Sequence, residues 1–298
     1  MIKALIGSIE RDATHDGPGI RTTVFFKGCT LKCPWCHNPE LISPSPETAF
    51  HAARCIGCGD CMRACPEGAI ELERAGRIER ERCKGCGECG VACPARAMEL
   101  VGRSYEVPVL IEILLRDRRF YETSGGGVTL SGGEPTCQMG FLGPLLHSLK
   151  TEGIHTTIQT NGFFEWQDFE IILPFIDLVF FDLKVADEKQ HVAMTGVGNT
   201  RILANLARLV AIRGDDVVVR VPLIPSYTAT EENIGSIAAL LYEMGVRQCS
   251  LLPYHPYGLS KSETIGKIAD PRLLRSSMGP EELEKWNRFF SWAELIKC

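Results

Sequence analysis

The feature that most constrains the fold of this chain is a doubled cysteine motif in its first third. The spacing C-x2-C-x2-C-x3-C-P occurs twice, and the sequence around it repeats, with RCIGCGDCMRACPEGAIEL followed by RCKGCGECGVACPARAMEL. The eight cysteines are Cys55, Cys58, Cys61, Cys65, Cys83, Cys86, Cys89 and Cys93. Small residues separate them, so the backbone can wrap closely around a bound group and point its amides at the sulfur atoms.

This doubled spacing is that of bacterial ferredoxins with two [4Fe-4S] clusters, in which the fourth cysteine of each motif binds the other cluster. The sequence therefore predicts two ligand sets that cross between the motifs. One set is Cys55, Cys58, Cys61 and Cys93, and the other is Cys83, Cys86, Cys89 and Cys65. Zinc also binds cysteine pairs, but eight cysteines in this doubled order disfavour zinc.

A third cysteine motif precedes these two. Within GCTLKCPWCHNPE, three cysteines are spaced as Cys29-x3-Cys33-x2-Cys36. Three thiolates on a four-iron cube leave one iron without a protein ligand, and an open metal position is typical of a reactive centre rather than a structural one. A partial zinc knuckle or a chance grouping of cysteines is the alternative for these residues taken alone.

Composition indicates a reduced compartment and excludes some partners. The chain has 14 cysteines in 298 residues, of which 11 lie between Cys29 and Cys93, too few elsewhere for a disulfide scaffold. The net charge of -5, with no basic tract, disfavours nucleic acid as a partner. The N-terminus lacks a signal-peptide pattern, and no apolar run approaches the roughly 20 residues of a membrane helix. We expect a cytoplasmic protein that does not bind membranes.

The pattern of strands and helices predicts an α/β fold. Candidate strands are Thr22–Phe26, Gly127–Leu130, Thr156–Gln159, Leu178–Leu183, Val217–Pro222 and Ser250–Leu252. Amphipathic segments such as Arg201–Ile212 and Glu231–Met244 lie between them. Six βα units favour a partial (β/α)6 barrel formed by residues 1–50 and 103–298, although the pattern alone leaves a doubly wound sheet open.

The cysteine-rich segment 51–102 reads as an inserted ferredoxin-like α+β domain. We expect a short strand beside each cluster, at Ala69–Leu72 and Ala97–Val101. The Pro/Ser-rich ISPSPETAF precedes the insert, and a helical pattern begins at Pro108 after it.

Motifs that contain polar residues lie at or near the ends of successive strands of the expected barrel, where such folds hold their chemistry. They are Gly132, Gly133 and Glu134, then Thr160 and Asn161, then Asp182, Leu183 and Lys184, and finally Arg220 and His255. Each has an ordinary structural reading as a tight turn, an ion pair, a surface arginine or a hydrogen-bonded histidine. Together they surround one opening.

The order of DGPGIRT, the three-cysteine loop, SGGGVTLSGGEP, TNGF, DLK, RVPLIP and LLPYHPYG closely resembles the glycyl radical enzyme activating enzymes, over nearly the whole chain. The resemblance implies that Cys29, Cys33 and Cys36 hold a catalytic [4Fe-4S] cluster whose open iron binds S-adenosylmethionine. It further implies cofactor contacts from Gly132, Gly133, Glu134, Lys184 and His255, an adenine contact from Trp35 with its neighbour His37, and pocket positions for Asp182 and Arg220.

The same resemblance implies the reaction and the partners. One electron cleaves S-adenosylmethionine to methionine and a 5′-deoxyadenosyl radical, which removes an α-hydrogen from a backbone glycine of a partner enzyme. We expect three clusters in all, flavodoxin or ferredoxin as electron donor, and a monomer. The two insert clusters either relay electrons or help to dock the partner. Because typical pyruvate formate-lyase activases lack such an insert, a different glycyl radical enzyme is the expected partner.

Several residues depart from the family pattern. Gln159 stands where an acidic residue often precedes Thr-Asn-Gly, which puts a cation site in doubt, and Pro225-Ser226 replaces a usual Pro-Gly, so that loop is expected to differ in shape. We interpret Cys137, Cys249 and Cys298 as ordinary thiols. Two other functions stay open at this stage: a radical enzyme acting on a small molecule, and a ferredoxin-type electron carrier, which would leave the open-site loop without a role.

Overall fold

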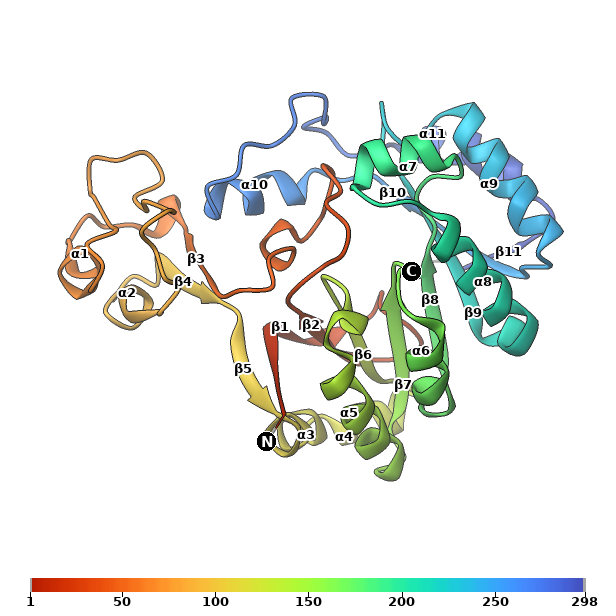
Figure 1. Cartoon of the computed structure of the whole chain (residues 1–298), viewed down its shortest axis with the longest axis horizontal. Helices are drawn as coiled ribbons and strands as arrows, with labels where there is room; N and C mark the ends of the chain where they lie inside the picture. Colours follow the sequence, from red (N-terminus) through yellow and green to blue (C-terminus); the bar gives the residue numbers. More distant parts are fainter. Residues whose placement is uncertain (1, 297–298) are drawn as a thin grey trace.

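A computed structural model describes residues 2–296. Its main body is a nine-stranded sheet in the order β11-β10-β9-β8-β7-β6-β2-β1-β5 (Figure 1). Six neighbouring strands of this sheet run parallel. They are β2 (Arg21–Phe26), β6 (Gly127–Gly132), β7 (His155–Thr160), β8 (Leu178–Asp182), β9 (Val217–Leu223) and β10 (Gln248–Pro253).

These six strands are the predicted ones, and their arrangement confirms the partial barrel. They follow one another across the sheet in sequence order, without the reversal of strand order that defines a doubly wound sheet. All six carboxyl ends therefore lie along one edge. The residues of the predicted opening are carried by this edge.

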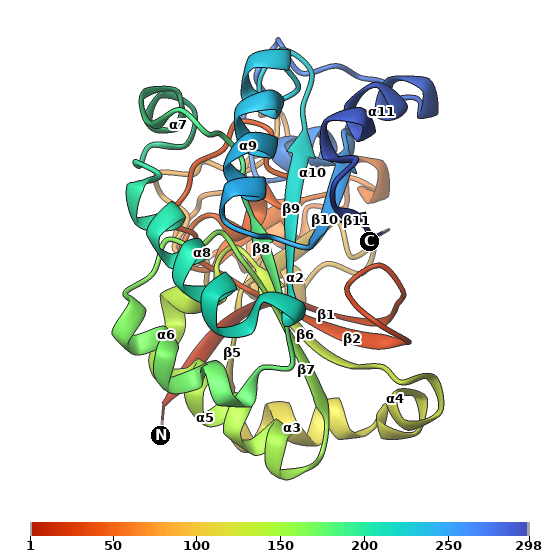
Figure 2. The ribbon, with the colours of Figure 1, turned by 90° about the vertical axis from the view of Figure 1, so that its right-hand side faces the viewer.

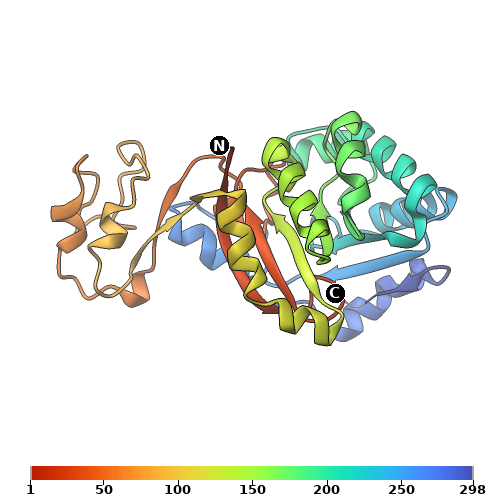
Figure 3. The ribbon, with the colours of Figure 1, turned by 90° about the horizontal axis from the view of Figure 1, so that it is seen from below.

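Helices cover the outer face of the curved sheet (Figures 2 and 3). They are α3 (Val107–Leu115), α4 (Arg118–Ser124), α5 (Met139–Thr151), α6 (Trp166–Ile172), α8 (Thr200–Arg213), α9 (Glu231–Glu243) and α11 (Pro280–Asn287). Two further helices, α7 (Glu188–Thr195) and α10 (Tyr257–Thr264), instead lie beside the three-cysteine loop at the carboxyl ends of the strands. The two helices predicted from amphipathic periodicity correspond to α8 and α9. Their buried leucines and isoleucines, such as Leu206 and Ile237, pack in one apolar core with the β-branched residues of the strands.

Three further strands extend the sheet beyond the predicted six. β1 (Lys3–Ala13) pairs antiparallel with β2, and β5 (Arg103–Glu106) pairs antiparallel with β1. The two-residue β11 (Glu294–Leu295) runs parallel to β10 at the opposite edge. β5 directly follows the cysteine-rich segment, so that segment leaves and rejoins the main body close to β1 and β2.

The cysteine-rich segment projects to one side of the barrel (Figure 1). It contains the short helices α1 (Asp60–Ala64) and α2 (Glu88–Val91), and β4 (Met98–Val101) pairs antiparallel with β3 (Glu47–Phe50). The strand expected at Ala69–Leu72 was wrong, since only an isolated bridge joins Ile70 to Ile78. An apolar run needs a partner strand to become a strand, and here the partner of β4 lies before the first motif.

Candidate active site

The three-cysteine loop follows the carboxyl end of β2. Two long-range backbone hydrogen bonds fix its course, from the Gly28 amide to the Leu41 carbonyl (2.8 Å) and from the Lys32 amide to the Thr195 carbonyl (2.8 Å). The Leu31 amide donates to the sulfur of Cys29 at 3.4 Å. A backbone amide that donates to the sulfur of a cluster ligand is one of the protein's means of tuning such a centre.

Burial favours the neutral thiol form of the three cysteines in this loop over the thiolate form. It raises the pKa of Cys29, where Glu134 adds to the effect, and the pKa of Cys36. Burial also raises the pKa of Cys33 to about 12. Metal ligation requires thiolates, so bound iron must displace the protons of these thiols.

The turn after β6 packs directly against the three-cysteine loop, and its glycines are required for that contact. A Cβ on Gly132 would lie 2.3 Å from backbone atoms of Phe26, and Gly132 has a φ of 116°, which favours glycine. A Cβ on Gly133 would lie 2.3 Å from the carbonyl oxygen of Gly28. The paired glycines therefore set how closely β6 approaches the cysteines.

Glu134, the next residue, joins the ends of two strands. Its carboxylate is fully buried and accepts hydrogen bonds from the Asn161 amide (2.7 Å), the Thr160 hydroxyl (2.9 Å), and the hydroxyl and amide of Thr136 (2.8 and 3.2 Å). Three of the four bonds go to Oε1, which leaves Oε2 able to accept another. Burial raises the pKa of this carboxyl, against the lowering effect of its hydrogen bonds.

The turn after β7 also reaches the cysteines. The Asn161 side-chain amide donates to the Thr30 hydroxyl at 3.2 Å and lies 3.6 Å from the sulfur of Cys29. Gly162 follows with a φ of 77°, and a Cβ there would meet the ring of Phe181 at 2.1 Å. The Thr-Asn-Gly motif thus couples the third strand of the barrel to the cluster loop.

A charged triad joins the end of β8 to the middle of β9, where Asp182 lies opposite Arg220 in the ladder. Asp182 pairs with Lys184 (3.0 Å) and with Arg220 (2.7 Å). Burial would raise the pKa of Asp182, but Arg220 and Lys184 outweigh it and lower that pKa to about 2. Burial would likewise lower the pKa of Lys184, but Asp182 outweighs it and the pKa is raised. Two cations against one carboxylate leave the triad with a net positive charge.

These strand ends surround a cavity of about 290 Å³. Predicted residues that line it are Cys29, Cys33, Trp35, Cys36, His37, Gly132, Gly133, Thr160, Asn161, Asp182, Lys184 and Arg220. Three predicted residues are not in its lining. Leu183 is fully buried beneath it, the carboxylate of Glu134 is engaged as described above, and His255 lines an adjacent smaller cavity with His37.

Sequence reasoning missed Asp16 and Ser131, which also line the cavity. Asp16 belongs to the quoted DGPGIRT segment, but no role was assigned to it. Gln159 connects the two, since its side chain accepts from the Ser131 hydroxyl (2.6 Å) and donates to the Asp16 carboxylate (2.9 Å). The Thr23 hydroxyl donates to the same carboxylate at 2.7 Å. A carboxylate at position 159 would lack the proton that this contact with Asp16 uses.

Two histidines stack where the cavities meet. The rings of His37 and His255 lie 3.9 Å apart between centroids. Burial, followed by the neighbouring His255, lowers the pKa of His37 to about 4, and burial lowers the pKa of His255. Nε2 of His37 and Nδ1 of His255 are buried without a hydrogen-bond partner. Buried polar atoms of this kind call for a partner, and a polar ligand in the cavity would provide one.

The remaining residues that differ from the family pattern are Ser226 and the three cysteines without an assigned cluster. Ser226 has a φ of 66°, the left-handed conformation that a glycine would adopt without strain. Cys137 is exposed beside the glycine-rich turn, and Cys249 is fully buried in the main apolar core. Cys298 lies outside the described residues.

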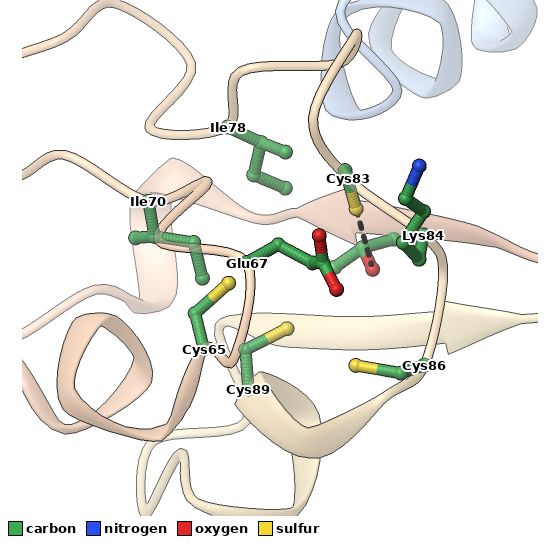
Figure 4. A pocket seen from close by; sticks show the side chains of 9 residues that line it. Cys65, Glu67, Ile70, Ile78, Cys83, Lys84, Cys86 and Cys89 are labelled. Carbon is green, nitrogen blue, oxygen red and sulfur yellow. Dashed lines mark hydrogen bonds between the residues drawn. The ribbon is translucent and has the colours of Figure 1, made fainter.

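The eight cysteines of the insert surround two separate cavities. One is lined by Cys55, Cys58, Cys61 and Cys93, and the other by Cys65, Cys83, Cys86 and Cys89. Figure 4 shows the sulfur atoms of the second set turned toward a shared space. Within residues 2–296, no three His, Cys, Asp or Glu side chains are arranged to hold a single metal ion. A [4Fe-4S] cube is larger than one ion, and four thiols spread around a cavity are the donor set that it takes.

The two cavities are built alike. Each short helix begins after a left-handed glycine, Gly59 before α1 and Gly87 before α2. The fourth cysteine of each motif accepts a hydrogen bond from an amide four residues on, Ala69 to Cys65 at 3.3 Å and Ala97 to Cys93 at 3.2 Å. The sequence repeat is therefore also a structural repeat.

Comparison with known proteins assigns the family. Family models match as a 4Fe-4S single cluster domain at residues 15–65, a 4Fe-4S dicluster domain at residues 54–97 and the Radical SAM superfamily at residues 76–240. The trans-4-hydroxy-L-proline dehydratase activating enzyme of Clostridioides difficile is 39% identical over 290 residues, 96% of this chain and 95% of that protein. The chain belongs to the glycyl radical enzyme activating enzymes.

Other relatives of this activating enzyme agree with that assignment. The pyruvate formate-lyase 2-activating enzyme of Escherichia coli is 37% identical over 89% of this chain and 82% of its own length. Among solved structures, SuiB of Streptococcus suis bound to precursor peptide SuiA has a TM-score of 0.53 at 15% identity, covering 91% of this chain and 47% of that one. At that identity the likeness speaks for the fold alone.

The activating enzyme is thus a radical S-adenosylmethionine enzyme with [4Fe-4S] clusters that acts on a protein partner. Across the described part of the chain, none of the helices has the length and apolar character needed to cross a membrane.

Proposed function

We propose that this protein installs a radical on a backbone glycine of one particular partner enzyme. The observation that carries the proposal is the joining of three thiols, a glycine-rich turn and a charged triad around one cavity. The chemistry supplied by the bound groups is one-electron cleavage of S-adenosylmethionine to methionine and a 5′-deoxyadenosyl radical, which takes one α-hydrogen from the glycine. This hydrogen becomes part of 5′-deoxyadenosine, and the unpaired electron remains on the glycine.

The residues of the cavity would bind and orient the cofactor rather than transfer protons. Lys184 and Arg220 offer positive charge to its carboxylate, and the Gly132-Gly133-Glu134 turn offers acceptors to its amine. Trp35 lies along the cavity wall for the adenine, and His37 and His255 hold unpartnered ring nitrogens for polar groups. Asp182 keeps both cations in place, and Thr160 and Asn161 hold the turn beside Cys29. The rate then derives from position and from exclusion of competing reactions.

We further propose three clusters. Cys29, Cys33 and Cys36 would hold the catalytic one, and the two thiol sets of the insert would hold the others. Residues 51–102 would form a domain separate from residues 1–50 and 103–298. Its two clusters would relay electrons from flavodoxin or ferredoxin, and the enzyme would act as a cytoplasmic monomer that docks transiently on its partner.

The partner is proposed to be a glycyl radical enzyme other than pyruvate formate-lyase itself. One relative is named for a dehydratase and another for a pyruvate formate-lyase 2. Relatives of this chain are therefore named for different partner chemistries, and the gene next to this one is the most direct indication of which partner applies.

The test is anaerobic reconstitution followed by reduction in the presence of S-adenosylmethionine. We expect formation of 5′-deoxyadenosine, and with the right partner a glycine-centred doublet in the electron paramagnetic resonance spectrum. An electron carrier would leave the cofactor intact, and a small-molecule radical enzyme would cleave it without producing the doublet on any glycyl radical enzyme. The proposal fails if the variant Cys29→Ala, Cys33→Ala, Cys36→Ala forms 5′-deoxyadenosine at the rate of the parent protein.

A further inference from the structure

A groove of about 700 Å³ lies on the insert, outside the active site. It runs along β4 between α2 and the start of β5, and Arg54 lines its remaining side. Val91 of α2 stands in this groove with 87% of its surface exposed. An apolar side chain so exposed next to charged residues is a common element of a protein contact.

The groove shares walls with both cluster cavities. Cys86, which is exposed, lines the groove and also the cavity formed with Cys65, Cys83 and Cys89. Met98 lines the groove and also the cavity of the other thiol set. A redox protein seated here would therefore be separated from each cluster by a single layer of side chains. Electron transfer weakens steeply with distance, so this closeness is what a donor requires.

The groove is positively charged. Arg54, Arg96 and Arg103 line it, all three are exposed, and none of them pairs with a carboxylate of the described residues. The only acidic residue in the lining, Glu99, is already engaged with His51 at 2.9 Å.

The other exposed arginines of the insert differ in this respect. Arg63 pairs with Asp60, and Arg74 and Arg82 both pair with Glu79. Arg77 and Arg80 have no carboxylate partner but are only half-exposed; Arg77 lies over the Phe50 ring and Arg80 donates to backbone carbonyls. Within residues 51–103, the exposed arginines without a carboxylate partner therefore all line the groove.

We infer that this groove, lined by Arg54, Arg96 and Arg103, is the docking surface for an acidic electron-carrier protein. The inference rests on the proposed function. One electron passes from the reduced carrier to an oxidised cluster of the insert, so the carrier is oxidised by one electron and no proton or atom moves. Charge complementarity of this kind steers association and sets its rate, and electron-transfer complexes form through small interfaces.

The experiment compares two reductants on the reconstituted full-length protein. A reduced acidic flavodoxin is the protein donor, and photoreduced deazariboflavin is a small neutral donor that needs no docking surface. For the double variant Arg96→Glu, Arg103→Glu, we expect cluster reduction by flavodoxin to slow by about tenfold or more at low ionic strength. Reduction by deazariboflavin should match the parent. Added salt should slow the parent and narrow the difference between the two proteins.

The double variant Arg63→Glu, Arg74→Glu is the matched control, because it makes the same charge change on the same insert outside the groove. It should reduce at the parent's rate with both donors. Equal flavodoxin rates in the double variant and the parent would overturn the inference and place the donor elsewhere, for example beside the exposed Cys58 and Ile56.

A second result would also overturn the inference. If the double variant is reduced by both donors at the parent's rates yet forms less glycyl radical, the groove docks the partner enzyme instead. Failure of the proposed function is distinguishable from both results, because the parent protein would then cleave no S-adenosylmethionine with either donor.

Discussion

Glu134 offers the sharpest test of how this site is held together. Glu134→Ala removes the acceptor of four hydrogen bonds, two of them buried. The hydroxyls of Thr136 and Thr160 can rotate to other partners, but the backbone amides of Asn161 and Thr136 lose the acceptor that lay 2.7 and 3.2 Å away. A buried donor left unsatisfied costs about 1–3 kcal/mol, and bonds to a charged acceptor are worth about 1.5–3 kcal/mol each. We expect Glu134→Ala to lose about 3 kcal/mol of stability.

Glu134→Gln should behave differently. Its oxygen can accept from the Asn161 amide while its NH2 group faces the two threonine hydroxyls, which can turn to accept, so only the part-buried Thr136 amide loses its acceptor. The neutral amide also avoids the cost of burying a charge. We therefore expect stability within about 1 kcal/mol of the parent. A loss of affinity for S-adenosylmethionine in this variant then reports direct contact between the Glu134 carboxylate and the cofactor.

The assay is anaerobic thermal unfolding of the reconstituted proteins, together with equilibrium binding of S-adenosylmethionine. The exposed Glu170→Ala on α6 is the control for removal of a glutamate that makes no such bonds. A melting temperature for Glu134→Ala equal to that of Glu170→Ala would refute the role of Glu134 in joining β6 to β7.

Three other predictions test separate parts of the structure. Burial and the nearby Arg21 lower the pKa of His155 below its ordinary 6.5. The unfolded chain therefore binds more protons than the folded one, and stability should fall as pH drops below 6.5. His155→Gln should flatten the pH profile of the melting temperature, and an unchanged slope would contradict this. Gly133→Ala places a Cβ 2.3 Å from the Gly28 carbonyl oxygen and should lower both iron content and 5′-deoxyadenosine formation. Gly140→Ala, whose Cβ would meet nothing within 4 Å, should change neither. Equal iron content in the two variants would refute the close packing of the glycine-rich turn on the three-cysteine loop. Cys65→Ala should remove about four irons per chain and the spectrum of the set that includes Cys83; loss of the other set instead would disprove the crossed assignment.

The sequence was sufficient for the parts of the fold governed by strong local patterns. The six parallel strands and helices α8 and α9 were predicted because their apolar residues recur with regular spacing. β3 and β11 escaped prediction because each is four residues or fewer and depends on a distant partner. The strand expected at Ala69–Leu72 had the right composition but no neighbouring strand to pair with.

The sequence predicted which residues form the site, but not the contacts that join them. Motif positions identified the cysteines, the glycine-rich turn and the charged triad, because each lies at or near the end of a strand. The stacking of His37 on His255 and the bridge from Gln159 to Asp16 join residues more than a hundred positions apart. Such contacts follow from the curvature of the sheet, which a single sequence does not encode locally. The role of Glu134 as an acceptor for two neighbouring turns belongs to the same class.

The pairing of β3 with β4 has a consequence for how such enzymes diversify. Glu47 and Val101 are directly opposite partners in that ladder, so the polypeptide enters and leaves the ferredoxin-like unit through adjacent positions. A tight turn across those two residues would close the gap. Evolution can therefore add or delete this whole cysteine-rich unit in one genetic event and leave the barrel continuous.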